Sequence, residues 1–91
     1  MNESSGRPPL AALGLRLGDR VRFRRGTGHW TEGVVTGRER DGSVSLQDRK
    51  CASRAIAAAR LEVRRPGPRG APRWLPVEEL AARREQLSLF G

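Results

Sequence analysis

Ninety-one residues suffice for one small domain, and a chain of this length buries only about two-thirds of the surface that its unfolded form exposes. At this length we do not expect a second independent core, and the hydrophobic content of 36%, set against a globular average of about 45–50% that also counts glycine, predicts one compact unit with loose ends. The formal charge of +8 predicts attraction for polyanions, nucleic acid first and acidic membrane surfaces second. Nearly every cation is arginine, which binds phosphate more specifically than lysine does, although a GC-rich genome would produce the same bias.

The single cysteine, Cys51, excludes an internal disulfide and a cysteine-based zinc site, so a reducing cytoplasm is the expected compartment. No apolar run resembles a signal peptide or approaches the roughly 20 residues that span a bilayer. We therefore expect a cytoplasmic protein that does not contact a membrane. Residues 1–9 are rich in Ser, Gly, Pro and Asn and are predicted to be a disordered leader.

Alternating polar and apolar residues begin at Asp19, and they predict strands. Val21 and Phe23 fall on one face while Arg20, Arg22 and Arg24 fall on the other. A second strand is predicted over residues 30–38, and the Asp41-Gly42 pair predicts a tight hairpin before a third strand at 43–46. Residues 51–56 and 61–65 read as two more strands, with one helical turn at 57–60 between them.

Five short strands with tight turns predict a mainly β fold, namely a small closed barrel over residues 10–65. The opening Gly18-Asp19-Arg20-Val21 and the strand spacing up to Arg65 resemble the SH3-like barrels of the KOW and Tudor type. The resemblance covers about half the chain and implies the fold, but it implies no function by itself.

Residues 66–75 contain so many prolines and glycines that we expect a basic linker there, without a ladder or a helix. Within it, 73–75 could pair as an extended edge, or Trp74 could pack on the barrel. Pro76 then favours the first position of a short helix over 76–85, with Glu78 and Glu79 in its first turn. Residues 86–91 are predicted to form an extended tail.

The run Gln86-Leu87-Ser88-Leu89-Phe90 resembles the pentapeptide by which proteins bind the bacterial DNA polymerase III β sliding clamp, Gln-Leu-Ser/Asp-Leu-Phe, at every position. The resemblance implies that Leu89 and Phe90 enter a deep apolar pocket of the clamp. It further implies that Gln86 hydrogen-bonds in a neighbouring subsite, that Leu87 covers the rim, and that Ser88 is the small polar spacer.

Three large apolar side chains in a solvated tail also require a covering surface on physical grounds. An alternative is that Leu87, Leu89 and Phe90 fold back as a last strand of the barrel. We expect the pentapeptide to be the clamp-binding site of a monomeric protein.

The arginines of the outward-facing strand positions predict phosphate contacts that position a nucleic acid without reading its sequence. The alternative is a solvated face made rich in arginine by codon bias. The candidate nucleic-acid-binding residues are Arg20, Arg22, Arg24, Arg25, Arg38, Arg40, Arg64, Arg65, Arg69 and Arg73. Trp30 and Trp74 could stack on bases, but tryptophans in so small a domain are more often part of the core, and we interpret Cys51 as a buried small residue.

We find no catalytic pattern in the sequence, and with His29 as the only histidine we expect no metal site and no cofactor. The sequence therefore predicts a non-enzymatic DNA replication or repair accessory protein that binds the clamp and contacts DNA, with RNA as a second option. Two alternatives stay open: a competitive inhibitor of the clamp pocket that does not bind DNA, and a ribosome- or RNA-associated barrel of the KOW type.

Overall fold

The protein folds as a mainly β domain with a C-terminal helix, seen in a computed structural model that describes the backbone of residues 7–24 and 26–90 and the side chains of residues 7–24 and 26–83. One antiparallel sheet of six strands runs through these residues in the order β4-β3-β2-β1-β5-β6. The strands are β1 (Arg20–Arg24), β2 (Trp30–Arg38), β3 (Val44–Asp48), β4 (Ser53–Ile56), β5 (Leu61–Pro66) and β6 (Pro72–Pro76). The helix α1 spans Val77–Phe90, and short 3-10 helices lie at Leu10–Leu13 (η2), Ala58–Arg60 (η3) and Pro68–Gly70 (η4).

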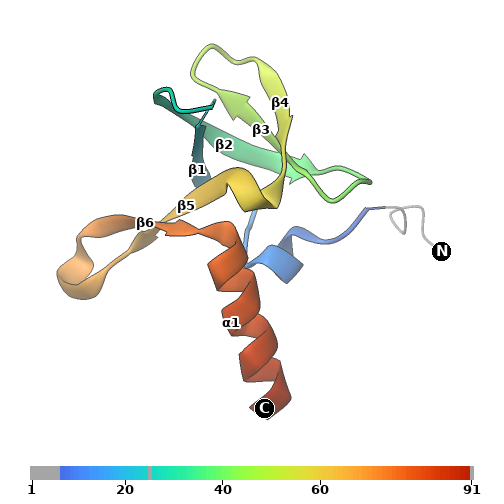
Figure 1. Cartoon of the computed structure of the whole chain (residues 1–91), viewed down its shortest axis with the longest axis vertical. Coiled ribbons are helices and arrows are strands. Elements are labelled where there is room, and N and C mark those ends of the chain that lie inside the picture. Colours follow the sequence, from blue (N-terminus) through green and yellow to red (C-terminus); the bar gives the residue numbers. More distant parts are fainter. Residues whose placement is uncertain (1–6, 25, 91) are drawn as a thin grey trace.

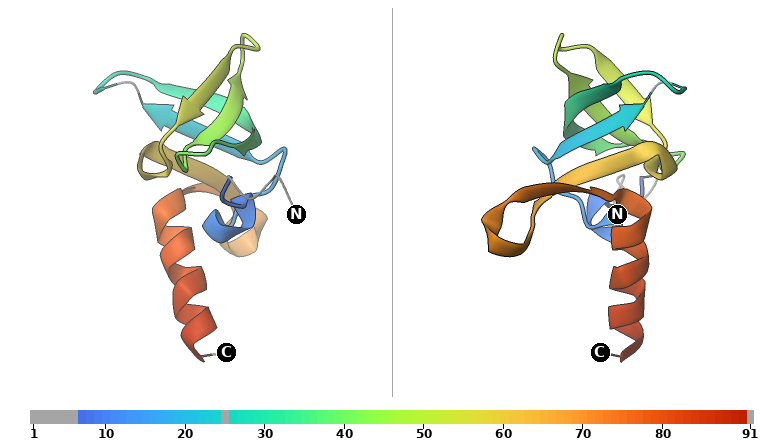
Figure 2. Two further views of the ribbon diagram at one scale, coloured as in Figure 1. Left: turned by 90° about the vertical axis from the view of Figure 1, so that its right-hand side faces the viewer. Right: turned by 60° about the vertical axis from the view of Figure 1, so that its left-hand side comes forward.

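The alternation predicted for β1 is confirmed, because Val21 and Phe23 are buried while Arg20 and Arg24 are exposed. The sheet coils so that β3 and β4 turn over β1 and β5, and the inner sides of these strands enclose the core (Figures 1 and 2). Full burial of a side chain the size of Phe23 or Leu46 is worth about 1.5–3 kcal/mol. The core cluster comprises Leu13, Leu15, Val21, Phe23, Val35, Val44, Leu46, Ile56, Leu61, Val63 and Val77.

The sheet is not closed into a barrel, which corrects the prediction of a closed five-stranded barrel. Strand β5 pairs with β1 along one edge and with the sixth strand, β6, along the other. Because both edges of β5 are occupied, β4 pairs only with β3 within the described sheet. The sheet therefore ends at β4 on one side and at β6 on the other.

The prediction of an unpaired linker at residues 66–75 is also wrong. Pro66 pairs in register with Pro72 at the end of a β5–β6 hairpin, and the Gly67 amide donates to the Ala71 carbonyl at 2.6 Å. Proline fits here because it lies at strand ends and on an edge strand, where the missing N–H leaves no ladder bond unmade. The extended pairing considered for residues 73–75 is the arrangement that forms.

Gly33 lets β2 and β3 approach closely. A Cβ at this position would lie 2.6 Å from the Gln47 carbonyl oxygen and 2.8 Å from Leu46 Cδ1, so no other residue fits without a shift of backbone. The pairing of β2 with β3 then shifts register between Val35 and Gly37. Irregular pairing of this kind is common where a glycine lies inside a strand.

The turn between β3 and β4 places Cys51 on the surface, which corrects the prediction that this cysteine is buried. Its backbone has a left-handed φ of 62°. The turn is held by Asp48, whose carboxylate accepts hydrogen bonds from the Lys50 and Ala52 amides at 2.9 and 3.0 Å.

The helix α1 begins directly after β6 and continues to Phe90, so the predictions of a helix ending at residue 85 and of an extended tail are wrong. Val77 is fully buried and Leu80 and Ala81 pack against the core, which fixes the start of the helix beneath the sheet. From there α1 projects away from the strands, and its end lies far from β3 and β4 (Figure 1). The leader predicted at residues 1–9 lies mostly outside the described residues, although Pro9 accepts a hydrogen bond from Arg38.

Candidate functional site

The outer side of β1 carries the arginines that alternate with its buried residues. Arg22, at the centre of the strand, faces Glu32 on β2 and Glu62 on β5 in the sheet register. Its Nε donates to Glu62 Oε1 at 2.8 Å, and its Nη2 lies 2.6 Å from the same oxygen. Both side chains are about a quarter exposed, so this charge-assisted pair is partly screened by solvent.

Two tryptophans flank Arg22 on this outer side. The Arg22 guanidinium carbon lies 4.0 Å from the centroid of the Trp30 ring and 4.7 Å from that of Trp74. Arg24 lies 4.4 Å from Trp30. Cation–π contacts of this kind are worth about 0.5–1 kcal/mol at exposed sites, and they hold the rings and guanidinium groups in a fixed row.

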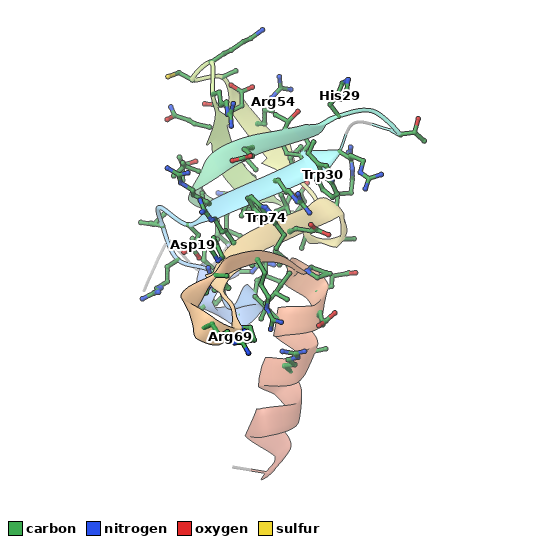
Figure 3. The ribbon with its side chains drawn as sticks, turned by 90° about the vertical axis from the view of Figure 1, so that its left-hand side faces the viewer. Asp19, His29, Trp30, Arg54, Arg69 and Trp74 are labelled. Carbon is green, nitrogen blue, oxygen red and sulfur yellow. The ribbon has the colours of Figure 1, made fainter. Side chains whose placement is uncertain are left out.

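Both tryptophans are half-buried and lie outside the core cluster, so the interpretation of them as core residues is wrong. Trp30 comes from the start of β2 and Trp74 from β6, and Figure 3 shows them on the same side of the sheet. We call the side chains of Arg22, Arg24, Trp30 and Trp74 the arginine–tryptophan row. Alternation in the sequence places Arg22 and Arg24 on the outer side of β1, but the sides of Trp30 and Trp74 follow only from the register of the sheet.

Arg20 and Arg64 extend the row on the same side of the sheet. Arg20 precedes Arg22 by two residues on β1, and Arg64 is the register partner of Trp74. Both are exposed. Among the side chains that the structure describes, no carboxylate lies within salt-bridge distance of Arg20, Arg24 or Arg64.

Two of the predicted nucleic-acid contacts, Arg38 and Arg65, are instead engaged within the domain. Arg38 donates to the carbonyls of Gly42 and Pro9 at 3.0 and 2.7 Å. Arg65 donates to the Gly14 carbonyl at 2.8 Å and to the Asp19 carboxylate at 2.9 Å, which ties the η2 region to β5. The structure therefore separates these two guanidinium groups from the outer face.

The remaining predicted arginines lie at other places. Arg69 is exposed at the tip of the β5–β6 hairpin, as Figure 3 shows, with a left-handed φ of 65°. Arg73 is opposite Arg65 in register, on the side of β6 away from Trp74, and Arg40 is exposed in the turn beyond the far end of β2 from Trp30. Arg25 lies outside the described residues.

Acidic residues that organise these arginines were not predicted from the sequence. Asp48 is 5% exposed and accepts a hydrogen bond from Arg54 Nε at 2.7 Å, and this bond, with those from the Ala52 and Lys50 amides, holds the pKa of Asp48 below its usual value. Asp19 accepts both the Arg16 amide and Arg65. Asp48 ends a strand three residues before the turn cysteine and Asp19 directly precedes a strand. Neither position gives a sequence signal for its arginine partner, so these pairs needed the tertiary structure.

The proposed clamp-binding residues, Gln86 to Phe90, occupy the last turns of α1. The described side chains of the helix that pack against the core all lie within residues 77–81, and Ala82 and Arg83 are exposed. The pentapeptide thus follows the anchored turn, on the part of the helix that projects from the sheet (Figure 1). The side chains of Gln86 to Phe90 lie outside the described residues, so the alternative of a closing strand is judged by the backbone alone, which is helical.

The described part of the chain has open hollows on its surface. One, of about 320 Å³, lies over the β2–β3 pairing between Arg20, Glu32, Val34 and Asp48. In the described part of the chain no three acidic, histidine or cysteine side chains come together as metal ligands, and no helix there is long and apolar enough to cross a membrane. His29 is exposed in the β1–β2 turn.

No protein-family model, curated protein or solved structure matches this chain. Any functional assignment therefore depends on its own residues.

Proposed function

We propose that this protein is a non-enzymatic accessory of DNA replication or repair that binds the bacterial sliding clamp through Gln86–Phe90 and contacts nucleic acid through the outer face of its sheet. It would act at the nucleoid, in the cytoplasm. One observation carries the proposal: the five residues agree with the clamp-binding pentapeptide at every position. In this assignment Leu89 and Phe90 fill the apolar pocket of the clamp and Gln86 supplies the polar contact beside it.

The docking of α1 supports this assignment. Val77, Leu80 and Ala81 anchor the helix to the core, while the pentapeptide follows some five residues later on the projecting part. A binding segment in that position is accessible to a partner as large as a clamp without any change in the sheet.

The expected affinity is micromolar. Burial of Leu89 and Phe90 is worth about 1.5–3 kcal/mol each, and the ordering of the segment removes part of that gain. A micromolar dissociation constant corresponds to about 8 kcal/mol, which the polar contacts of Gln86 and the backbone would complete.

For the fold, we propose an opened relative of the SH3-like barrel. The pairing of β1 with β5 and the 3-10 turn η3 directly before β5 agree with that topology. The departure lies in β6, which occupies the outer edge of β5. This likeness concerns shape alone and adds no argument on function.

The test is a binding titration of the full chain against a purified bacterial β clamp. The double variant Leu89→Ala, Phe90→Ala should weaken binding at least tenfold, because it removes the side chains that enter the pocket. Ser88→Asp should retain wild-type affinity, since the pentapeptide pattern accepts either residue at this position.

A matched control reorders residues 86–90 to Leu-Gln-Phe-Ser-Leu, which keeps the composition and the charge while it destroys the pattern. We expect no binding by this variant. Equal affinity of the reordered and natural segments would show that general hydrophobicity, and not the pentapeptide, holds the clamp.

A further inference from the structure

The outer face of β2, β1, β5 and β6 separates aromatic surface from free positive charge. Its centre is the arginine–tryptophan row, where the charge of Arg22 is already matched by Glu62. Arg20 and Arg64 lie beside the row, and these two arginines, like Arg24 within it, have no carboxylate partner among the described side chains. A ligand that fits this face therefore has flat apolar groups at its middle and negative charge at its margins.

We propose that this face binds single-stranded nucleic acid in preference to duplex, with bases stacked on Trp74 and Trp30 and phosphates bound by Arg20, Arg24 and Arg64. The inference rests on the proposed contact with nucleic acid and adds the form of the strand. It is independent of clamp binding.

The form of the ligand follows from the aromatic rings. A duplex keeps its base faces stacked inside, so indole rings on a sheet surface can gain stacking energy only from bases that are unpaired. A duplex reader instead needs an element that enters a groove. Here the tryptophans come from β2 and β6, which β1 and β5 separate in the sheet, and Figure 3 shows both on one side of it.

Trp74 is the principal base platform. It has one guanidinium over its ring, that of Arg22 at 4.7 Å, whereas Trp30 has Arg22 at 4.0 Å and Arg24 at 4.4 Å. Arg24 is exposed, so it can leave Trp30 for a phosphate when a strand binds. Arg22 stays in place because Glu62 holds it, and it keeps the two rings apart on either side of its guanidinium.

The chain provides its own probe, because Trp30 and Trp74 are its only tryptophans and it has no tyrosine. Intrinsic fluorescence therefore reports on this face alone. The experiment titrates the full chain with oligothymidylate, with oligouridylate and with a duplex, each of roughly 16 nucleotides or base pairs, the upper end of the site size for single-strand binders. We expect quenching by the single strands and binding to them at least tenfold tighter than to duplex.

Variants assign the effect to residues. Trp74→Ala should weaken single-strand binding by about tenfold, as the loss of one base stack does, and leave duplex affinity unchanged. Arg64→Ala should weaken binding and reduce its salt dependence by about one phosphate contact, whereas the control Arg40→Ala, which removes the same charge beyond the far end of β2, should change affinity much less. Tighter binding of oligothymidylate than of oligouridylate identifies DNA as the strand, and the reverse order identifies RNA.

Two results would overturn the inference. One is saturation of the protein by a labelled single strand without any change in tryptophan fluorescence, which needs no variant and is unaffected by folding defects. The other is equal affinity for single strand and duplex with equal effects of Arg64→Ala and Arg40→Ala, which would leave only non-specific charge. The variant Leu89→Ala, Phe90→Ala tests the clamp proposal separately, because it should lose clamp binding and keep its affinity for single strands.

Discussion

At the scale of single residues, the arginines of this protein divide by the partners that they find. Arg22, Arg54 and Arg65 are paired with carboxylates that lie far from them in sequence or across a turn, while Arg20 and Arg64 point to solvent without such a partner among the described side chains. Charge patterning along the chain does not separate these two groups. The arginines without a carboxylate partner are the ones that are available to bind a phosphate.

Asp48 provides a prediction at this scale. Its folded pKa lies below the usual aspartate value, chiefly because of the hydrogen bond from Arg54. Its contribution to stability is therefore present above the unfolded pKa of about 4 and is lost as the pH falls through the folded pKa. Asp48→Asn should lower the free energy of unfolding at pH 7, because the amide group faces the Arg54 guanidinium without a negative charge. The difference from wild type should shrink towards pH 2.

Urea denaturation between pH 2 and pH 7 measures this effect. The control is Asp41→Asn, an exposed turn residue whose pKa is lowered mainly by the Ser43 hydroxyl and which holds no arginine. We expect its effect at pH 7 to be smaller. A stability difference for Asp48→Asn that is as large at pH 2 as at pH 7 would contradict the role of its charge.

At the scale of elements, α1 poses a conformational question. The sequence predicts an extended segment at residues 86–90, whereas the structure shows these residues in a helix. The described side chains of this 14-residue helix pack on the core only within its first five residues, and short helices in water are marginal and depend on tertiary contacts. Unwinding of the last turn on the clamp would therefore cost little.

Glu85→Pro tests this idea. Proline removes the amide that bonds to residue 81 and disfavours the helical conformation of the residue before it, so α1 should end before the pentapeptide. We expect lower helical content by circular dichroism and clamp affinity equal to or above that of wild type. Glu85→Ala keeps the helix and is the control, and loss of clamp binding by the proline variant alone would mean that the clamp recognises the helical form.

At the scale of the whole molecule, the two proposed sites lie on different parts of a body that measures 37 × 37 × 22 Å. The arginine–tryptophan row lies on the outer side of the sheet, and the pentapeptide lies on the part of α1 that projects away from it (Figures 1 and 3). A clamp and a nucleic acid strand can therefore be held at the same time. Linkage of two weak sites raises the effective concentration of the second to about the millimolar range.

We accordingly expect apparent affinity for a primed single-stranded template to rise at least tenfold when a clamp is loaded on it. Surface plasmon resonance on template with and without clamp measures the gain. Leu89→Ala with Phe90→Ala should abolish it and leave the affinity for bare template unchanged. Clamp binding without any such gain would favour a protein that competes for the clamp pocket.

The sequence by itself determined the first five strands and the short motif. Period-two alternation fixed which residues of β1 face the core, the Asp41-Gly42 pair fixed a turn, and the identity of Gln86–Phe90 is legible without coordinates, because these signals depend on neighbours in the chain. The predictions of a linker and of an extended tail failed because the local sequence allows two outcomes in each case. Proline occurs at strand ends as well as in linkers, and residues 85–90 can continue a helix or be extended.

Only the tertiary structure decided the rest. The addition of β6 to β5 keeps the sheet open, and it brings Trp74 over an arginine 52 positions earlier in the chain, held there by Glu62. Cross-strand pairing joins residues that no local pattern connects. The sequence therefore contained the arginines and tryptophans of the outer face, but their assembly into one surface required the register of the sheet.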